Sequence, residues 1–86
     1  MSNQERIEAL KEDLRQHRDE LRLKLHLAGE EGKEQWEALE KKYENFAARA
    51  SQMRREAGDI SSDLVTATGL LGEEIKKGYK RLRDLL

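Results

Sequence analysis

The sequence predicts an all-α protein in which long helices pack against one another. Small and apolar residues recur every three or four positions from Ile7 to Leu85, which keeps one narrow stripe on the same face of a helix. The chain contains no proline, so no helix is forced to stop internally. Charged residues make up 41% of the 86 residues and hydrophobic residues 36%, a balance typical of long helices or coiled coils. A chain of this size predicts one helical coiled-coil domain over residues 1–86.

The first predicted helix covers about residues 3–57. Ser2 followed by Glu5 has the form of a capping box, in which the two side chains satisfy free amides of the first turn. Gly29 and Gly32 interrupt the good helix formers, but each weakens a helix by only about 1 kcal/mol relative to alanine. The stripe also passes these glycines in steps that a continuous helix accommodates. We therefore expect an unbroken first helix.

A second, shorter helix is predicted over about residues 60–85. Gly58 is a favourable residue just after a helix end, and Asp59 is a favourable N-cap for the next helix. Acidic residues come first in this segment and basic residues last, as the helix dipole favours. Folding the segment back about Gly58 brings Phe46 opposite Leu71 and the region from Trp36 to Leu39 opposite Gly78 and Leu82, which gives an antiparallel hairpin with coiled-coil packing. The predicted hairpin core consists of Trp36, Leu39, Tyr43, Phe46, Met53, Ile60, Leu64, Leu71, Ile75 and Leu82.

Two alternative arrangements are open. One uninterrupted helix would keep the stripe in phase past Gly58 and would be about 125 Å long, at about 1.5 Å per residue. A break at residues 29–32 would instead give three helices of similar length in a compact bundle. Against the second alternative, a three-helix core needs a wide apolar stripe on every helix. Residues 33–57 supply little beyond the single row.

The hairpin would leave the beginning of the first helix uncovered. Residues 3–32 would project beyond the second helix with a row of apolar side chains exposed, and such rows mark an interface. We therefore expect a homo-oligomeric bundle, with a dimer favoured, in which two of these arms pair. The predicted self-association residues are Ile7, Leu10, Leu14, His17, Leu21 and Leu25.

The chain shows no pattern that predicts catalysis, a metal site or a cofactor. It has no cysteine, and its two histidines, His17 and His26, lack the E-x-x-H spacing of a di-iron bundle. The simpler interpretation of His17 is a polar residue that sets register, and a metal-dependent role is the weaker one. Narrow helices offer little concave, water-excluding surface, so we do not expect an enzyme. Ion pairs four residues apart are expected for Glu20–Lys24, Glu37–Lys41 and Glu73–Lys77.

Charge and hydropathy narrow the choice of partners. Seventeen basic and eighteen acidic residues leave a net charge of −1, which predicts no nucleic-acid partner. Neither a signal peptide nor a run near the roughly 20 apolar residues of a membrane span is present, so we expect a cytoplasmic protein. The last helix combines a basic cluster with an apolar arc from Leu70 to Leu86 that is wider than one helix can cover. The candidate membrane or partner face comprises Lys76, Lys77, Tyr79, Lys80 and Arg81.

The chain resembles a family of small uncharacterised bacterial coiled-coil proteins in three stretches, LHLA at 25–28, EQWEALEKK at 34–42 and LGEEIKKGY at 71–79. The resemblance covers about residues 20–83. It implies a helical hairpin whose first helix runs past Gly29, and it implies no activity. The predicted function is a non-enzymatic structural or protein-interaction module that self-associates and recruits an unidentified protein. Reversible membrane-surface binding through the last helix is the alternative.

Overall fold

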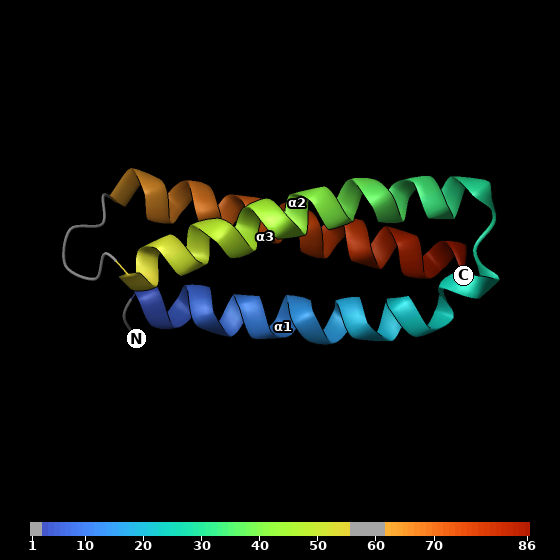
Figure 1. Ribbon diagram of the computed structural model, residues 1–86, viewed down its shortest axis with the longest axis horizontal. Coiled ribbons are helices and arrows are strands. Elements are labelled where there is room, and N and C mark those ends of the chain that lie inside the picture. The colour runs from blue at the N-terminus through green and yellow to red at the C-terminus, as the bar shows by residue number, and fades with distance from the viewer. Residues whose placement is uncertain (1–2, 56–61) are drawn as a thin grey trace.

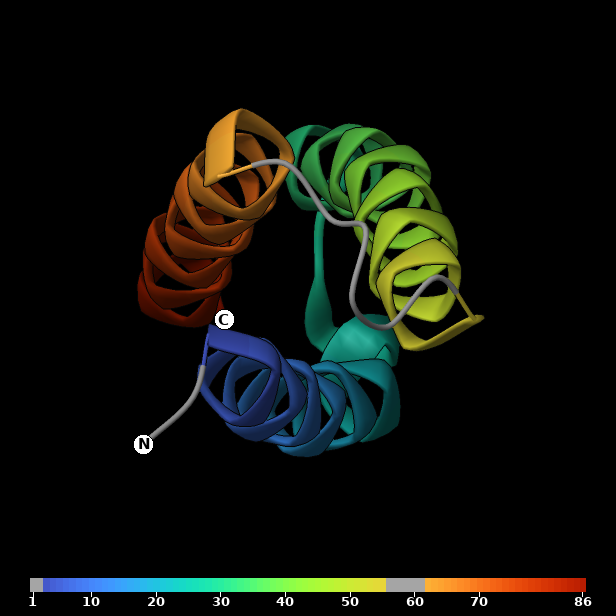
Figure 2. The same ribbon diagram turned by 90° about the vertical axis from the view of Figure 1, so that its left-hand side faces the viewer.

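A computed structural model of the chain describes residues 3–55 and 62–86. Within these residues three α-helices lie side by side along a bundle of 44 × 19 × 17 Å (Figure 1). They are α1 (Asn3–Lys24), α2 (Glu30–Arg55) and α3 (Ser62–Leu85), and a 3-10 turn, η1 (Leu25–Leu27), follows α1. α1 and α3 run in the same direction and α2 runs in the opposite one. Seen end-on, the helices occupy the corners of a triangle (Figure 2).

The predicted all-α class is confirmed, and the chain adopts the compact three-helix alternative with a break close to residues 29–32. The unbroken first helix over residues 3–57 is wrong, because α1 ends at Lys24 and α2 begins at Glu30. Our predicted capping residue Ser2 lies outside the described residues, as does the predicted break at residues 58–59. α3 begins at Ser62 and ends at Leu85, close to the predicted bounds of the second helix at about residues 60–85.

The turn between α1 and α2 has a defined backbone structure. Ala28 is extended, with φ −77° and ψ 139°, and its N–H donates to the carbonyl of Leu25 at 3.0 Å. The N–H of Lys33 donates to the carbonyl of Gly29 at 3.1 Å, so Gly29 occupies the N-cap of α2. Two glutamates follow at the positive end of the helix dipole. The glycine that was expected only to weaken a long helix therefore begins a new one.

Burial of the apolar stripe on α1 explains why the chain turns back. Ile7, Leu14 and Leu21 are 5%, 0% and 1% exposed, whereas in an unbroken helix no other part of the same chain would cover them. Burying one such side chain contributes about 1.5–3 kcal/mol. Each backbone hydrogen bond given up at a helix break contributes about 0.5–1.5 kcal/mol, so burial prevails. The expectation that the rest of the same chain leaves this row uncovered is wrong.

The buried face of α3 is centred one position away from the predicted row. Leu64 and Leu71, which were expected at its centre, are only half-buried. α3 contacts both α1 and α2, so its buried face is turned toward the space between two partners rather than toward one. The buried residues of α3 are Thr68, Gly72, Ile75, Tyr79 and Leu82.

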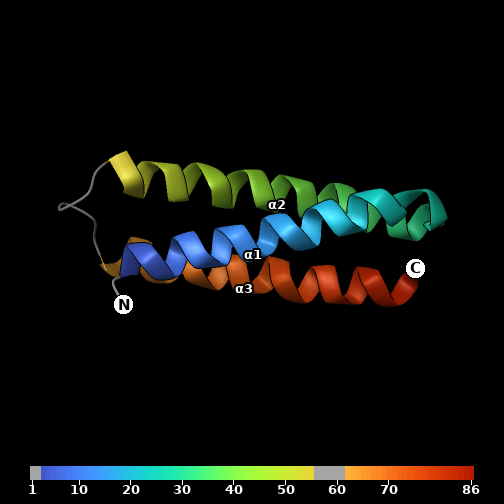
Figure 3. The ribbon, with the colours of Figure 1, turned by 90° about the horizontal axis from the view of Figure 1, so that it is seen from below.

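Most of the predicted hairpin core is confirmed as core of the bundle. Leu39 packs against Gly78, as the predicted antiparallel register requires, and Gly72 is covered closely by Leu10 of α1 and Phe46 of α2. Trp36, Leu39, Phe46, Met53, Ile75 and Leu82 are buried, and Tyr43, Leu64 and Leu71 pack half-buried against them. Ile60 lies outside the described residues. In the view from below, α1 crosses in front of α2 and α3 at an angle (Figure 3).

Candidate interaction surface

A hollow of about 400 Å³ lies between the N-terminal halves of α1 and α3. These two segments lie side by side in the view from below (Figure 3). The hollow is lined by Arg6, Ile7, Leu10, Ser62, Val65, Thr66, Gly69, Leu70 and Glu73. Buried or half-buried apolar side chains lie among polar and charged ones in this lining, which is the composition of a protein-binding surface.

Small side chains on α3 create this hollow. Ser62, Thr66 and Gly69 face the larger Ile7 and Leu10 of α1. A Cβ at Gly69 would lie 3.9 Å from Cδ1 of Ile7, so the backbone of α3 passes close to α1 without a side chain to fill the space above. The two helices therefore touch at depth and leave an open groove toward the surface.

Leu70 stands at the rim of the hollow with 66% of its surface exposed. Leaving a leucine in water forgoes the stabilisation that its burial would give, about 1.5–3 kcal/mol. A single exposed leucine needs no explanation, but here it adjoins a concave apolar floor. The combination of a protruding apolar side chain and an apolar hollow makes this part of the surface the candidate site.

Two unpaired charges flank the hollow. Arg6 on α1 and Glu73 on α3 are both exposed, and neither takes part in an ion pair among the described residues. The predicted pair between Glu73 and Lys77 is accordingly not formed. Both charges are therefore available to a partner that covers the hollow.

The C-terminal half of the same α1–α3 seam is closed by polar contacts. Nζ of Lys76 lies 3.1 Å from Oδ2 of Asp13, and Nη2 of Arg83 lies 3.9 Å from Oε2 of Glu20. Nη2 of Arg83 also donates to Nδ1 of His17 at 2.6 Å. Because an arginine can only donate, the neutral histidine carries its proton on Nε2, which lies 3.5 Å from Asp13. His17 thus sets register within one chain.

A part-buried ion pair joins α1 to α2. Nε and Nη2 of Arg18 donate to the two carboxylate oxygens of Glu40, both at 2.7 Å, and the guanidinium lies 4.9 Å from the centre of the Tyr43 ring. The hydrogen bonds to Glu40 raise the pKa of Arg18 above its ordinary value. Bidentate geometry of this kind fixes the relative position of two helices. Both carboxylate oxygens of Glu40 are engaged by Arg18 in this way.

Tyr79 is completely buried beside this pair, and its hydroxyl has no hydrogen-bond partner. Desolvation by burial raises the pKa of the Tyr79 phenol, so the group stays neutral. The prediction that Tyr79 belongs to an exposed membrane or partner face is therefore wrong. Thr68, about three helix turns before Tyr79 on α3, is also buried, and the Thr68 hydroxyl donates to the carbonyl of Leu64 at 2.8 Å.

The other residues of that predicted face are split. Lys76 is tied to Asp13, whereas Lys77, Lys80 and Arg81 are exposed on α3. The apolar side of α3 at this level faces the interior of the bundle. Leu85, four residues after Arg81, is 48% exposed beside this cluster, and membrane binding through this end of α3 stays a prediction.

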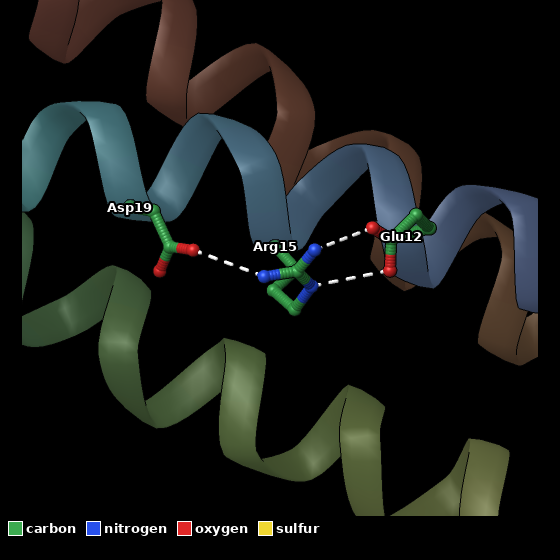
Figure 4. A network of polar contacts seen from close by, with 3 residues as sticks. All are labelled: Glu12, Arg15 and Asp19. Atoms are coloured by element: carbon green, nitrogen blue, oxygen red, sulfur yellow. Dashed lines mark hydrogen bonds and ion pairs between the residues drawn. The ribbon is translucent and has the colours of Figure 1, made fainter.

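Further ion pairs lie on the outer surface of the bundle. On α1, Arg15 lies between Glu12 and Asp19 and contacts both carboxylates, with 3.1 Å to Asp19 (Figure 4). The hydrogen bond from Arg15 lowers the pKa of Glu12. Lys42 of α2 reaches Glu74 of α3 at 2.7 Å and lowers the pKa of that carboxyl. These contacts support helix shape and register, and Lys42 and Glu74 also line a smaller hollow of about 240 Å³ between α2 and α3.

The structure separates the six predicted self-association residues into two groups. Ile7 and Leu10 line the hollow, so they lie where a partner could reach their edges. The remaining four serve the inside of the bundle: Leu14 and Leu21 are core, Leu25 packs against it, and His17 pairs with α3. Pairing of two whole arms along this row is therefore excluded as the mode of association in the folded bundle.

Residues of the hollow that sequence reasoning missed come mainly from the beginning of α3. Val65, Thr66 and Gly69 carry no motif, and Arg6 and Glu73 are ordinary helix-surface charges. A signal was present in the apolar arc that starts at Leu70 and is too wide for one partner helix. Leu70 at the N-terminal edge of this arc is 66% exposed, and Leu85 in its basic C-terminal part is 48% exposed.

Within residues 3–55 and 62–86, no three histidine, cysteine, aspartate or glutamate side chains gather where they could hold a metal ion. No described helix is both long enough and apolar enough to cross a membrane. Comparison of the chain with protein-family models, with curated proteins and with solved structures finds no match. We therefore infer function from the fold and the hollow.

Proposed function

We propose that this chain is a non-enzymatic protein-interaction module that associates with itself. The observation that carries the proposal is the apolar hollow between α1 and α3 with the exposed Leu70 at its rim. A small bundle that leaves both a concave apolar surface and a protruding leucine in water gains free energy when another protein surface covers them.

The polar groups of the interior favour a structural role over a chemical one. The Thr68 hydroxyl is bound to a backbone carbonyl, Arg18 and Glu40 are bound to each other, and the Tyr79 phenol is sealed from solvent. A general base or nucleophile must reach a substrate in a pocket, and these groups do not open onto the hollow. The interior therefore works as a rigid support for a binding surface.

The proposal is tested by the mass of the purified chain in solution. Static light scattering over a micromolar-to-millimolar concentration series should show a rise from the monomer mass of 10.0 kDa toward twice that value. The unfolding temperature should rise over the same series, because association stabilises the folded state by mass action. A constant 10.0 kDa mass with a concentration-independent unfolding temperature would overturn the proposal.

A further inference from the structure

The two charges beside the hollow lie diagonally across it. Leu10 of α1 packs against Gly72 of α3, so Glu73 is approximately level with Leu10. Arg6 precedes Leu10 by four residues, which places it about 6 Å nearer the N-terminal end at about 1.5 Å per residue. Since the two charges are also on different helices, the line between them runs obliquely over the floor of the hollow.

A surface with this arrangement is complementary to a copy of itself. A twofold axis that lies in the plane of the surface, perpendicular to the line joining the two charges, carries each charge onto the position of the other. Two facing copies related by that axis therefore set Arg6 of each against Glu73 of the other. Closed dimers with such isologous interfaces are the commonest oligomers of soluble proteins.

The apolar parts of the surface have the same property. Leu70 protrudes with 66% of its surface exposed, and the hollow beside it is open and apolar. One chain thus supplies both a knob and a hole, together with one charge of each sign. A second copy therefore supplies the complement of every one of these features.

We propose that two copies of the chain bind each other through their α1–α3 hollows about such a twofold axis. Leu70 of each copy enters the hollow of the other, and Arg6 of each copy pairs with the partner's Glu73. This inference rests on the proposed self-association and specifies where it occurs. It also accounts for the unpaired state of both charges in the isolated bundle.

Charge exchange between two variants tests the interface. Arg6→Glu should leave two glutamates facing each other across each contact, and Glu73→Arg two arginines. Each single variant should therefore dimerise about tenfold more weakly than the unaltered chain, measured by sedimentation equilibrium. An equimolar mixture of Arg6→Glu and Glu73→Arg should form a heterodimer of nearly unaltered affinity, because both contacts then join opposite charges. A chain that carries both Arg6→Glu and Glu73→Arg should also dimerise with nearly unaltered affinity.

Matched controls on another face keep the test specific. Lys41→Glu and Glu37→Arg make the same charge changes on the exposed surface of α2 and should leave dimerisation unchanged. Leu70→Arg should weaken the dimer at least about tenfold. Leu23→Arg, at a leucine that is 79% exposed near the opposite end of α1, should have no effect. Circular dichroism should show the same helix content for all variants.

The outcomes separate this inference from the broader proposal. A chain that stays monomeric at every concentration overturns both. A dimer that is insensitive to Leu70→Arg and to both charge reversals overturns the α1–α3 interface but leaves self-association standing. Weakening by the single reversals without recovery in the mixture overturns the reciprocal pairing, because the charges would then act within one chain.

Discussion

The two halves of the seam between α1 and α3 are built differently. In the C-terminal half, Lys76 and Arg83 reach across from α3 to polar partners on α1 and close the surface. In the N-terminal half, small residues such as Gly69 leave a hollow, and the flanking charges have no partner within the described chain. The comparison shows that one helix pair can be locked along part of its length and left available for binding along the rest.

The difference arises from side-chain length at equivalent positions. Lysine and arginine have long stems that cover apolar surface while their charged ends stay in water. Serine, threonine and glycine at the beginning of α3 cannot cover the neighbouring Ile7 and Leu10. The closed half therefore needs no partner, and the open half gains from one.

The largest expected difference between the halves is in the free energy of unfolding that is lost when a leucine is replaced by alanine. Leu14 is fully buried at the level of the closed half, and Leu14→Ala should lower the free energy of unfolding by about 2–5 kcal/mol. Leu70→Ala in the open half should change it by less than about 0.5 kcal/mol in the monomer. Urea unfolding at a concentration where light scattering gives the monomer mass measures both. Equal losses would show that Leu70 is packed in the monomer and would contradict the open hollow.

A smaller effect is expected from the buried phenol of the closed half. Burial raises the pKa of Tyr79, so the folded chain keeps the phenol proton. In the unfolded chain the phenol has its ordinary pKa of 10.0 and ionises as the pH rises above 10. Stability should therefore be unaffected by this group below pH 10 and fall above it, by about 1.4 kcal/mol per pH unit. Tyr79→Phe should remove this part of the alkaline loss.

At neutral pH, Tyr79→Phe should affect the stability of the chain for a different reason. Removing a buried hydroxyl that lacks a partner relieves a desolvation cost of about 1–3 kcal/mol, so Tyr79→Phe should be as stable as the unaltered chain or more stable. Thermal unfolding followed by circular dichroism at pH 7 and at pH 11 measures both effects. A clear loss of stability at pH 7 would mean that the hydroxyl makes a contact in solution.

The smallest effect is expected for the ion pairs that close the seam. Lys76→Ala should lower the free energy of unfolding by about 0.2–1 kcal/mol, because Lys76 and Asp13 are both partly exposed. The difference should shrink in about 1 M salt, where charges are screened within about 3 Å. Lys77→Ala, which removes an exposed lysine one residue further along, serves as the control. An undiminished difference at high salt would assign the effect to packing of the lysine stem.

Much of the core was predictable because helix packing follows local spacing. Leu39 and Gly78 meet as the antiparallel register requires, and Phe46, Met53, Ile75 and Leu82 are buried. These residues lie on α2 and α3, whose mutual arrangement depends mainly on the spacing within each helix. Spacing along α2 and α3 was therefore a sufficient guide to these residues.

Ion pairs were poorly predictable from spacing along a single helix. Glu20 was expected to pair with Lys24, but it lies nearest to Arg83 of α3. Arg18 and Glu40 are 22 residues apart in the chain and form a bidentate contact that no local pattern indicates. A long charged side chain can reach partners on neighbouring helices, and the packing of the bundle sets which partners are within reach. These contacts therefore depend on tertiary structure.

The sequence by itself determined that the chain is helical and which side of each helix is apolar, because spacing and the absence of proline act locally. Only the tertiary structure decided what covers the stripe on α1: the chain's own α2 and α3, not the α1 of a second copy. The same apolar surface can be buried either way. Closing a loop of a few residues costs less conformational entropy than immobilising a second molecule, so the turn at Ala28 and Gly29 prevails. The hollow beside α3 is the part of that surface which this closure leaves uncovered.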